Sequence, residues 1–299
     1  MKITIKFWAW INVICMFIVV LMGALVTKTG SGEGCGRSWP MCHGNLLPDH
    51  TIESLIEYSH RMVSGVAGFL VLGILIYAWR NMRQPAFTVA FWAAMSGFFF
   101  TMLQAFLGAM AVVWPQSPPI LALHFGFSLM ALSSTVAFLV WLNPEKMSVP
   151  RSDRKMVGWM LSIWVFTYGV IYLGALVRHT KSTGGCFGWP TCNGAWLPDE
   201  TWTTAAFTVF AHRLGAAWLF AFLIALFFLT RKLNLSTMFR QAAVRMILIC
   251  AIQIFSGAFI VWTLGNGPLQ LLTSMAHILF LSWLFIVMSN TILRLLASK

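Results

Sequence analysis

The sequence has little charge, and negative charge is the scarcer sign. Of 299 residues, 9% are charged, with 8 Asp and Glu against 20 Lys and Arg. Hydrophobic residues make up 59%, and the mean hydropathy is +0.79. A soluble domain of this length needs a far more polar surface, so the composition excludes that class and places the chain among integral membrane proteins.

Long stretches without any charged residue predict the number of membrane spans. A span needs about 20 apolar residues, so the two longest stretches must each hold two helices. They divide at the turn-forming segments Trp114–Pro119 and Gly265–Pro268. The stretches are Phe7–Thr27, Met62–Trp79, Pro85–Asn143, Met156–Val177, Leu214–Thr230 and Met246–Leu293. The sequence therefore predicts an all-α protein with eight transmembrane helices.

One segment of the chain is repeated in the sequence. Gly23–Arg61 recurs as Gly174–Arg213. Four helices per copy mean that both copies enter the membrane from the same side, so we expect two tandem four-helix bundles related by a pseudo-twofold along the membrane normal. The expected halves are residues 1–145 and 146–299, joined by the polar segment Asn143–Lys155. The recurring residues are Cys35, Trp39, Pro40, Cys42, Leu47, Pro48, Asp49, His60 and Arg61, matched by Cys186, Trp189, Pro190, Cys192, Leu197, Pro198, Asp199, His212 and Arg213.

The net charge of +12 lies on one side of the predicted helices. The termini and the connections near residues 80–85, 143–155 and 231–245 carry fourteen Lys or Arg and two acids, whereas the opposite side carries six of each. The positive-inside rule then predicts cytoplasmic termini and extracellular cysteine loops in the cell membrane. The basic charge needs no nucleic-acid partner. Because the first helix is not followed by an A-x-A cleavage site, we expect it to be a retained span.

Each predicted outer loop holds one pair of cysteines. Six residues lie between Cys35 and Cys42, and five between Cys186 and Cys192. In an oxidising compartment such pairs favour local structural disulfides. A redox-active pair and a zinc site are the alternatives, although these more often use C-x-x-C or other short spacings.

Four histidines lie near the outer ends of the even-numbered predicted helices: His60, His124, His212 and His277. Ionisable groups within a span are costly and tend to be functional. Two imidazoles from neighbouring helices of a bundle can ligate a haem iron, so each half could hold one haem. Copper or zinc would need a third ligand, which Glu57 could supply in the first half only. The other histidines, His43, His50 and His179, are predicted to be solvated loop residues.

The two copies differ at one acidic position, where Glu57 is replaced by Val209. An ion pair with Arg61 at i,i+4 is one role for Glu57, and a carboxylate beside the first haem is the other. Loss of the acid beside a retained histidine favours the second role. Lys28, Arg61, Arg178 and Arg213 could meet haem propionates, or could snorkel to the interface. The pattern Gln-x3-Gly-Ala at Gln104 and at Gln253 favours close helix contact.

Over essentially its whole length the chain resembles the haem A synthase family, in the short form with cysteine pairs in the outer loops. The resemblance lies in Gly23-Ala24-Leu25-Val26, the Cys35–Cys42 loop with Trp39-Pro40, Glu57-x-x-His60-Arg61, Gln104 with Gly108, His124, and the second-half copies that end in His212-Arg213 and His277.

The resemblance implies an oxidoreductase that converts haem O to haem A. The C8 methyl group would be hydroxylated twice and the product dehydrated to a formyl group. Glu57 would be the catalytic carboxylate. His60 and His124 would bind haem O, and His212 and His277 would ligate a permanent haem b. Expected partners are the haem O substrate, the farnesyltransferase that makes it, and an electron acceptor. A b-type cytochrome that only transfers electrons is the alternative.

Overall fold

The computed structural model describes residues 2–84, 87–114, 117–142 and 149–297, and eight long helices account for most of them. All eight are long and apolar enough to cross a membrane, which confirms the expected all-α fold and number of spans. The helices are α1 (Lys2–Thr29), α2 (Ile52–Asn81), α3 (Thr88–Val113), α4 (Pro118–Trp141), α5 (Val157–His179), α6 (Thr204–Lys232), α7 (Thr237–Trp262) and α8 (Gly267–Leu296).

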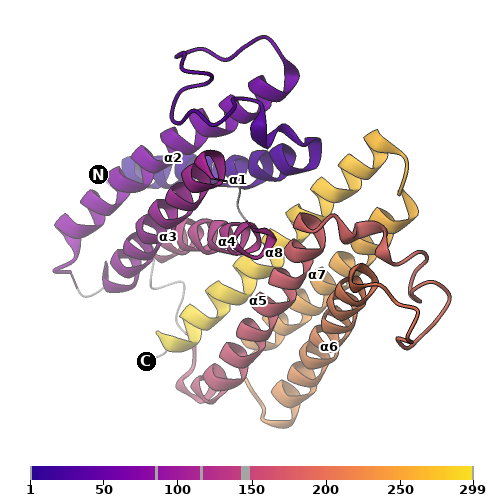
Figure 1. The fold of residues 1–299 in the computed structure, drawn as a ribbon. Helices are drawn as coiled ribbons and strands as arrows, with labels where there is room; N and C mark the ends of the chain where they lie inside the picture. The colour runs from indigo at the N-terminus through magenta and orange to yellow at the C-terminus, as the bar shows by residue number, and fades with distance from the viewer. Residues whose placement is uncertain (1, 85–86, 115–116, 143–148, 298–299) are drawn as a thin grey trace. The chain divides into compact units, whose positions relative to one another are not determined.

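The chain divides into two compact units, Met1–Met147 and Ser148–Lys299. In the first unit α1 and α3 each pack against both α2 and α4, so α2 and α4 stand on one diagonal of a four-helix bundle. In the second unit α5 and α7 each pack against both α6 and α8, which form the corresponding diagonal (Figure 1). The pseudo-twofold that would relate the two units stays a prediction, and the predicted boundary at residue 145 lies outside the described residues.

The large hydrophobic side chains of the second unit gather at one end of its bundle. Met160, Leu223, Phe239, Met246 and Met288 are all buried there. They come from the first half of α5 and α7 and the second half of α6 and α8. This end is therefore packed as a hydrophobic core, and the opposite end, which carries the cysteine loop, is left for His212 and His277.

Helices α2 and α6 begin well before their charge-free stretches. Thr51 caps α2 by accepting a hydrogen bond from the Ser54 amide (3.2 Å), and Thr203 caps α6 in the same way through the Ala206 amide (3.2 Å). Such caps satisfy backbone donors that the first helical turn leaves unpaired. As a result Glu57 and His60 lie within α2, on one helical face, rather than at its edge.

The described part of the expected linker is an ordered helical turn. Arg151–Met156 forms a 3-10 helix, and its Asp153 is fully buried. The Asp153 carboxylate accepts hydrogen bonds from the backbone amide (3.1 Å) and the hydroxyl of Ser236, the residue that caps α7. This turn is therefore anchored to the second unit.

We predict that Asp153→Ala destabilises the second unit, because it leaves two partly buried donors of Ser236 without an acceptor. Each such loss costs about 1–3 kcal/mol. Thermal unfolding in detergent should show a lower Tm for Asp153→Ala. Asp199→Ala, which removes an exposed carboxylate, should unfold close to the wild-type temperature. Equal Tm values for the two variants would contradict the anchoring role.

Candidate functional site

Both predicted disulfides are present, one in each cysteine loop. Cys35 is bonded to Cys42 and Cys186 to Cys192, and all four residues are at most 1% exposed. The two loops repeat the same backbone contacts: the Cys42 amide donates to the Asn45 carbonyl (2.9 Å), and the Cys192 amide to the Ala195 carbonyl (3.0 Å). The duplication in the sequence is thus a duplication of loop structure.

His43 and Asn193 hold corresponding places in these loops. Both have left-handed backbone angles, with φ of 49° and 55°. The His43 ring bonds to the Gly34 carbonyl (3.1 Å), and the Asn193 amide donates to the Gly185 carbonyl (3.3 Å). His43 is exposed, as expected of a loop residue, but it also has this local structural role.

Acidic residues of the loops are held by nearby donors. Asp199 accepts hydrogen bonds from the Thr201 amide (2.8 Å) and hydroxyl (2.5 Å). These two bonds lower the pKa of the Asp199 carboxyl below its usual value. Its counterpart Asp49 lies 3.5 Å from the His43 ring.

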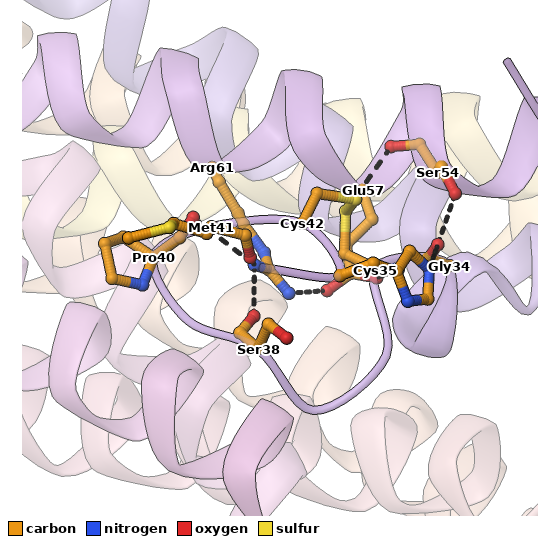
Figure 2. Close-up of polar contacts among 10 residues, drawn as sticks. Gly34, Cys35, Ser38, Pro40, Met41, Cys42, Ser54, Glu57 and Arg61 are labelled. Atoms are coloured by element: carbon orange, nitrogen blue, oxygen red, sulfur yellow. Dashed lines mark hydrogen bonds and ion pairs between the residues drawn. A yellow bond between two sulfur atoms is a disulfide. The ribbon is translucent and has the colours of Figure 1, made fainter. Parts of the chain in front are cut away.

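The Glu57 carboxylate is buried beneath the first disulfide loop, and both of its oxygens are engaged. One accepts a hydrogen bond from the Cys35 amide (2.9 Å), and the other is paired with the Arg61 guanidinium (2.5 Å; Figure 2). The residue is 3% exposed. A backbone amide and a guanidinium thus both donate to the one carboxylate.

Arg61 ties the same carboxylate to the loop. Its other terminal nitrogen donates to the carbonyls of Ser38 and Met41, each at 2.7 Å (Figure 2). The i,i+4 ion pair weighed from the sequence is therefore present, as part of a network that holds the loop on α2. The Ser54 hydroxyl adds a further bond to the Gly34 carbonyl.

The second unit keeps the arginine and replaces the acid by an apolar contact. Arg213 donates to the carbonyls of Thr191 (2.8 Å) and Cys186 (3.2 Å). Val209 is 5% exposed and packs with Cys186, Cys192 and Ala206 under the loop. The loop is thus held without a carboxylate, so loop anchoring alone does not require Glu57.

Each of the four helix histidines lies against a glycine of the preceding helix. A Cβ added to Gly23 would lie 3.2 Å from the His60 ring, and one added to Gly108 would lie 3.4 Å from the His124 ring. In the second unit the corresponding distances are 2.7 Å from Gly174 to His212 and 3.3 Å from Gly257 to His277. The four glycines give the imidazoles room beside a helix backbone.

The paired histidines come from diagonal helices. The expectation that they project from neighbouring helices was wrong, because α2 and α4, like α6 and α8, are separated by the helices that carry the glycines. Two imidazoles facing each other across a bundle can approach a planar ligand from both sides.

Hydrogen bonding of the imidazoles differs between the units. His212 Nδ1 bonds to the Val170 carbonyl (3.0 Å), and His277 Nδ1 to the Ser256 hydroxyl (2.8 Å). Nδ1 of His60 and of His124 is buried and has no hydrogen-bond partner among the described residues. The Gln104 backbone carbonyl lies near the His124 ring. The second pair is therefore oriented by the protein, and the first pair is not.

Comparison with known proteins identifies the family of this chain. The family model described as cytochrome oxidase assembly protein, COX15-CtaA, matches residues 6–288. The chain belongs to this family. Among its relatives, a protein of Bacillus licheniformis named heme A synthase is 41% identical over 92% of this chain and 90% of its own length. Proteins of the same name from Geobacillus kaustophilus and Shouchella clausii are 38% and 37% identical, over 100% and 95% of this chain and 94% of each relative.

The site residues of this family member fit bis-histidine haem ligation. The chain offers two imidazoles on each diagonal, buried Nδ1 atoms in the first unit, and glycines where side chains would crowd the rings. Among the described residues no group of three or more His, Cys, Asp or Glu is arranged to hold a metal ion, as a copper or zinc centre would require. Both oxygens of Glu57, the third ligand considered from the sequence, are engaged with Arg61 and Cys35.

The four residues predicted to contact haem propionates fall into two groups by their surroundings. Arg61 and Arg213 bind loop carbonyls, whereas Lys28 and Arg178 lie in the last turns of α1 and α5. Sequence reasoning missed the role of the four glycines and of Ser256. The glycines could have been found, because each recurs at the same place in both copies of the repeat.

We predict that Arg61→Gln makes the Cys35–Cys42 disulfide easier to reduce. Reduction of a buried disulfide needs local opening, and Arg61→Gln removes charged hydrogen bonds worth about 1.5–3 kcal/mol each. Reduction by dithiothreitol should accelerate roughly tenfold or more. Alkylation and peptide mass analysis would follow both loops, with Cys186–Cys192 as the internal control. Arg213→Gln should reverse the pattern, and equal rates for both loops in either variant would contradict the assignment.

Proposed function

We propose that the chain is a haem A synthase, a membrane oxidoreductase that converts the C8 methyl group of haem O to the formyl group of haem A. The relatives that match it over nearly their full length carry that name. The observation that carries the proposal is the asymmetry of the two units. Both hold a histidine pair, but only the first has a buried carboxylate one helical turn from a histidine, at Glu57 and His60.

In this proposal His60 and His124 hold the substrate haem O, and His212 and His277 hold a permanent haem b. The hydrogen bonds of the imidazoles support the division. A histidine whose Nδ1 is anchored keeps its orientation and is the more basic ligand, which suits a resident group. Imidazoles without such anchors suit a ligand that must enter as haem O and leave as haem A.

The reaction needs two oxidations of one carbon atom. The first replaces a methyl hydrogen by the hydroxyl of water and releases two electrons and two protons. The second gives a geminal diol, which loses water to leave the formyl group, again with release of two electrons and two protons. A bound haem supplies the reacting methyl group and a conjugated ring that can give up electrons. If His60 and His124 both bind the iron, no site there would be open to dioxygen, so water is the expected oxygen source.

Glu57 would handle the protons. Arg61 and the Cys35 amide hold its side chain in place, where a carboxylate could accept a proton from an attacking water or stabilise positive charge on the substrate. His60 lies three residues later in the same helix and would fix the substrate beside it. Electrons would leave through the second unit to an acceptor outside the chain. The farnesyltransferase that makes haem O is the expected source of substrate.

We predict that Glu57→Gln keeps the bound haem but loses oxidation, because glutamine keeps the size of the side chain and one of its two acceptor oxygens but cannot take up a proton. Loss of a general base typically costs about 100-fold or more in rate. Haem A formation from haem O would be followed by mass analysis of extracted haems. Glu53→Gln, which changes an exposed acid of the same helix, should retain turnover.

The Cys186–Cys192 loop is held on its helix without a carboxylate. The catalytic role of Glu57 can therefore be tested separately from its role in holding the Cys35–Cys42 loop. The rate of disulfide reduction in Glu57→Gln would report on the loop independently of turnover. Wild-type turnover by this variant would contradict the catalytic role.

We predict that Gly174→Ala displaces His212 and lowers the haem content of the second unit. The new methyl group would lie 2.7 Å from the ring, closer than van der Waals contact permits. Gly169→Ala is the matched control, because it lies in the same helix and no atom lies within 4 Å of its added Cβ. Pyridine haemochrome spectra of the purified variants would measure the haem. Full haem content in Gly174→Ala would contradict the role of the glycine.

A further inference from the structure

Ser256 bridges the backbone of α7 and a histidine of α8. Its Oγ lies 2.8 Å from the Gln253 carbonyl and 2.8 Å from His277 Nδ1. The residue is 7% exposed and directly precedes Gly257, the glycine beside the His277 ring. A polar side chain so far from water is stabilised only when its bonds are made, and here both are made within the unit.

The two contacts assign the direction of each hydrogen bond. A hydroxyl has one proton to donate, and the Gln253 carbonyl can only accept. The Ser256 proton therefore lies toward Gln253, and Oγ accepts the Nδ1–H of His277. A second contact agrees, since the side-chain amide nitrogen of Gln253 lies 3.0 Å from His277 Nε2 and is a donor. Both contacts place the imidazole proton on Nδ1 and the free lone pair on Nε2.

The first unit has no equivalent of this bridge. Leu107 precedes Gly108 as Ser256 precedes Gly257, and leucine offers no hydroxyl. His124 Nδ1 is buried without a hydrogen-bond partner among the described residues, and the Gln104 side chain points its amide at Met16 (3.8 Å to the sulfur). Both units have the glutamine, the glycine and the histidine at matching positions. The serine that precedes the glycine is found in the second unit, as Ser256, and is leucine in the first.

We propose that Ser256 is a positioning residue for the haem of the second unit: it fixes the His277 tautomer that ligates through Nε2 and lowers the reduction potential of that haem. The inference rests on the proposed function, which places a haem between His212 and His277. A hydrogen bond accepted from Nδ1–H makes the imidazole a stronger donor to iron, and this stabilises the ferric state. Gln253, which contacts Nε2, must release that atom when iron binds.

The test compares three variants of the full-length protein in detergent. Ser256→Ala removes the acceptor, and Ser256→Thr keeps a hydroxyl. Ser282→Ala is the matched control, because it removes another buried serine hydroxyl of the same unit, one that bonds only to the Ile278 carbonyl among the contacts described (2.8 Å). A spectroelectrochemical titration of the haem B absorbance would give the midpoint potential of each, with haem B content measured in parallel.

We expect Ser256→Ala to raise the midpoint potential of haem B, while Ser256→Thr and Ser282→Ala stay at the wild-type value. Loss of haem B from Ser256→Ala, with haem B retained in Ser256→Thr and Ser282→Ala, would also support the role. The two retained haem contents would show that the loss does not come from general instability. A wild-type potential in Ser256→Ala with haem B bound would overturn the inference and leave the proposed function intact. Absence of haem B from the wild-type protein would overturn both.

Discussion

The close approach of an imidazole to a helix backbone is the constraint on which the rest of the arrangement depends. At three places, beside Gly23, Gly174 and Gly257, the Cβ of any other residue would lie 2.7–3.3 Å from a histidine ring, and beside Gly108 it would lie at 3.4 Å. The glycine helices separate the histidine helices, so the two histidines of each pair come from helices on a bundle diagonal. The cysteine loops, the caps of α2 and α6, and the hydrophobic packing of the opposite bundle end all hold the helices at the level where these contacts form.

The duplicated scaffold is used in two different ways. In the first unit Glu57 and Arg61 of α2 bind the disulfide loop through Cys35, Ser38 and Met41, and neither imidazole has a hydrogen-bond partner at Nδ1 among the described residues. In the second unit the loop rests on Val209, and both imidazoles are anchored. The first unit thus has a polar network around Glu57 and Arg61 near its histidines. The second unit has two histidines whose rings are held by hydrogen bonds. This division of labour is what the proposed separation of a reacting haem from a resident haem requires.

Much of the fold was predictable, because burial in a membrane makes hydrophobic length and charge asymmetry decisive. The eight helices and both disulfides followed from such patterns, and the structure confirms them. The early start of α2 was not visible, since charged residues end a hydrophobic run even where Glu57 and Arg61 satisfy each other. The diagonal placement of the histidines, the use of Gly174 and the bridge at Ser256 depend on contacts between helices, and a single sequence does not specify those contacts.

Haem composition in histidine variants tests the central claim, that the two units hold different haems, most directly. Protein would be purified from cells that supply haem O, and its haems extracted and identified by mass for wild type, His124→Ala and His277→Ala. The account predicts haem O or A together with haem B in the wild type, loss of haem O and A in His124→Ala, and loss of haem B in His277→Ala. Two equivalents of haem B in the wild-type protein, as an electron-transfer cytochrome would hold, would contradict it.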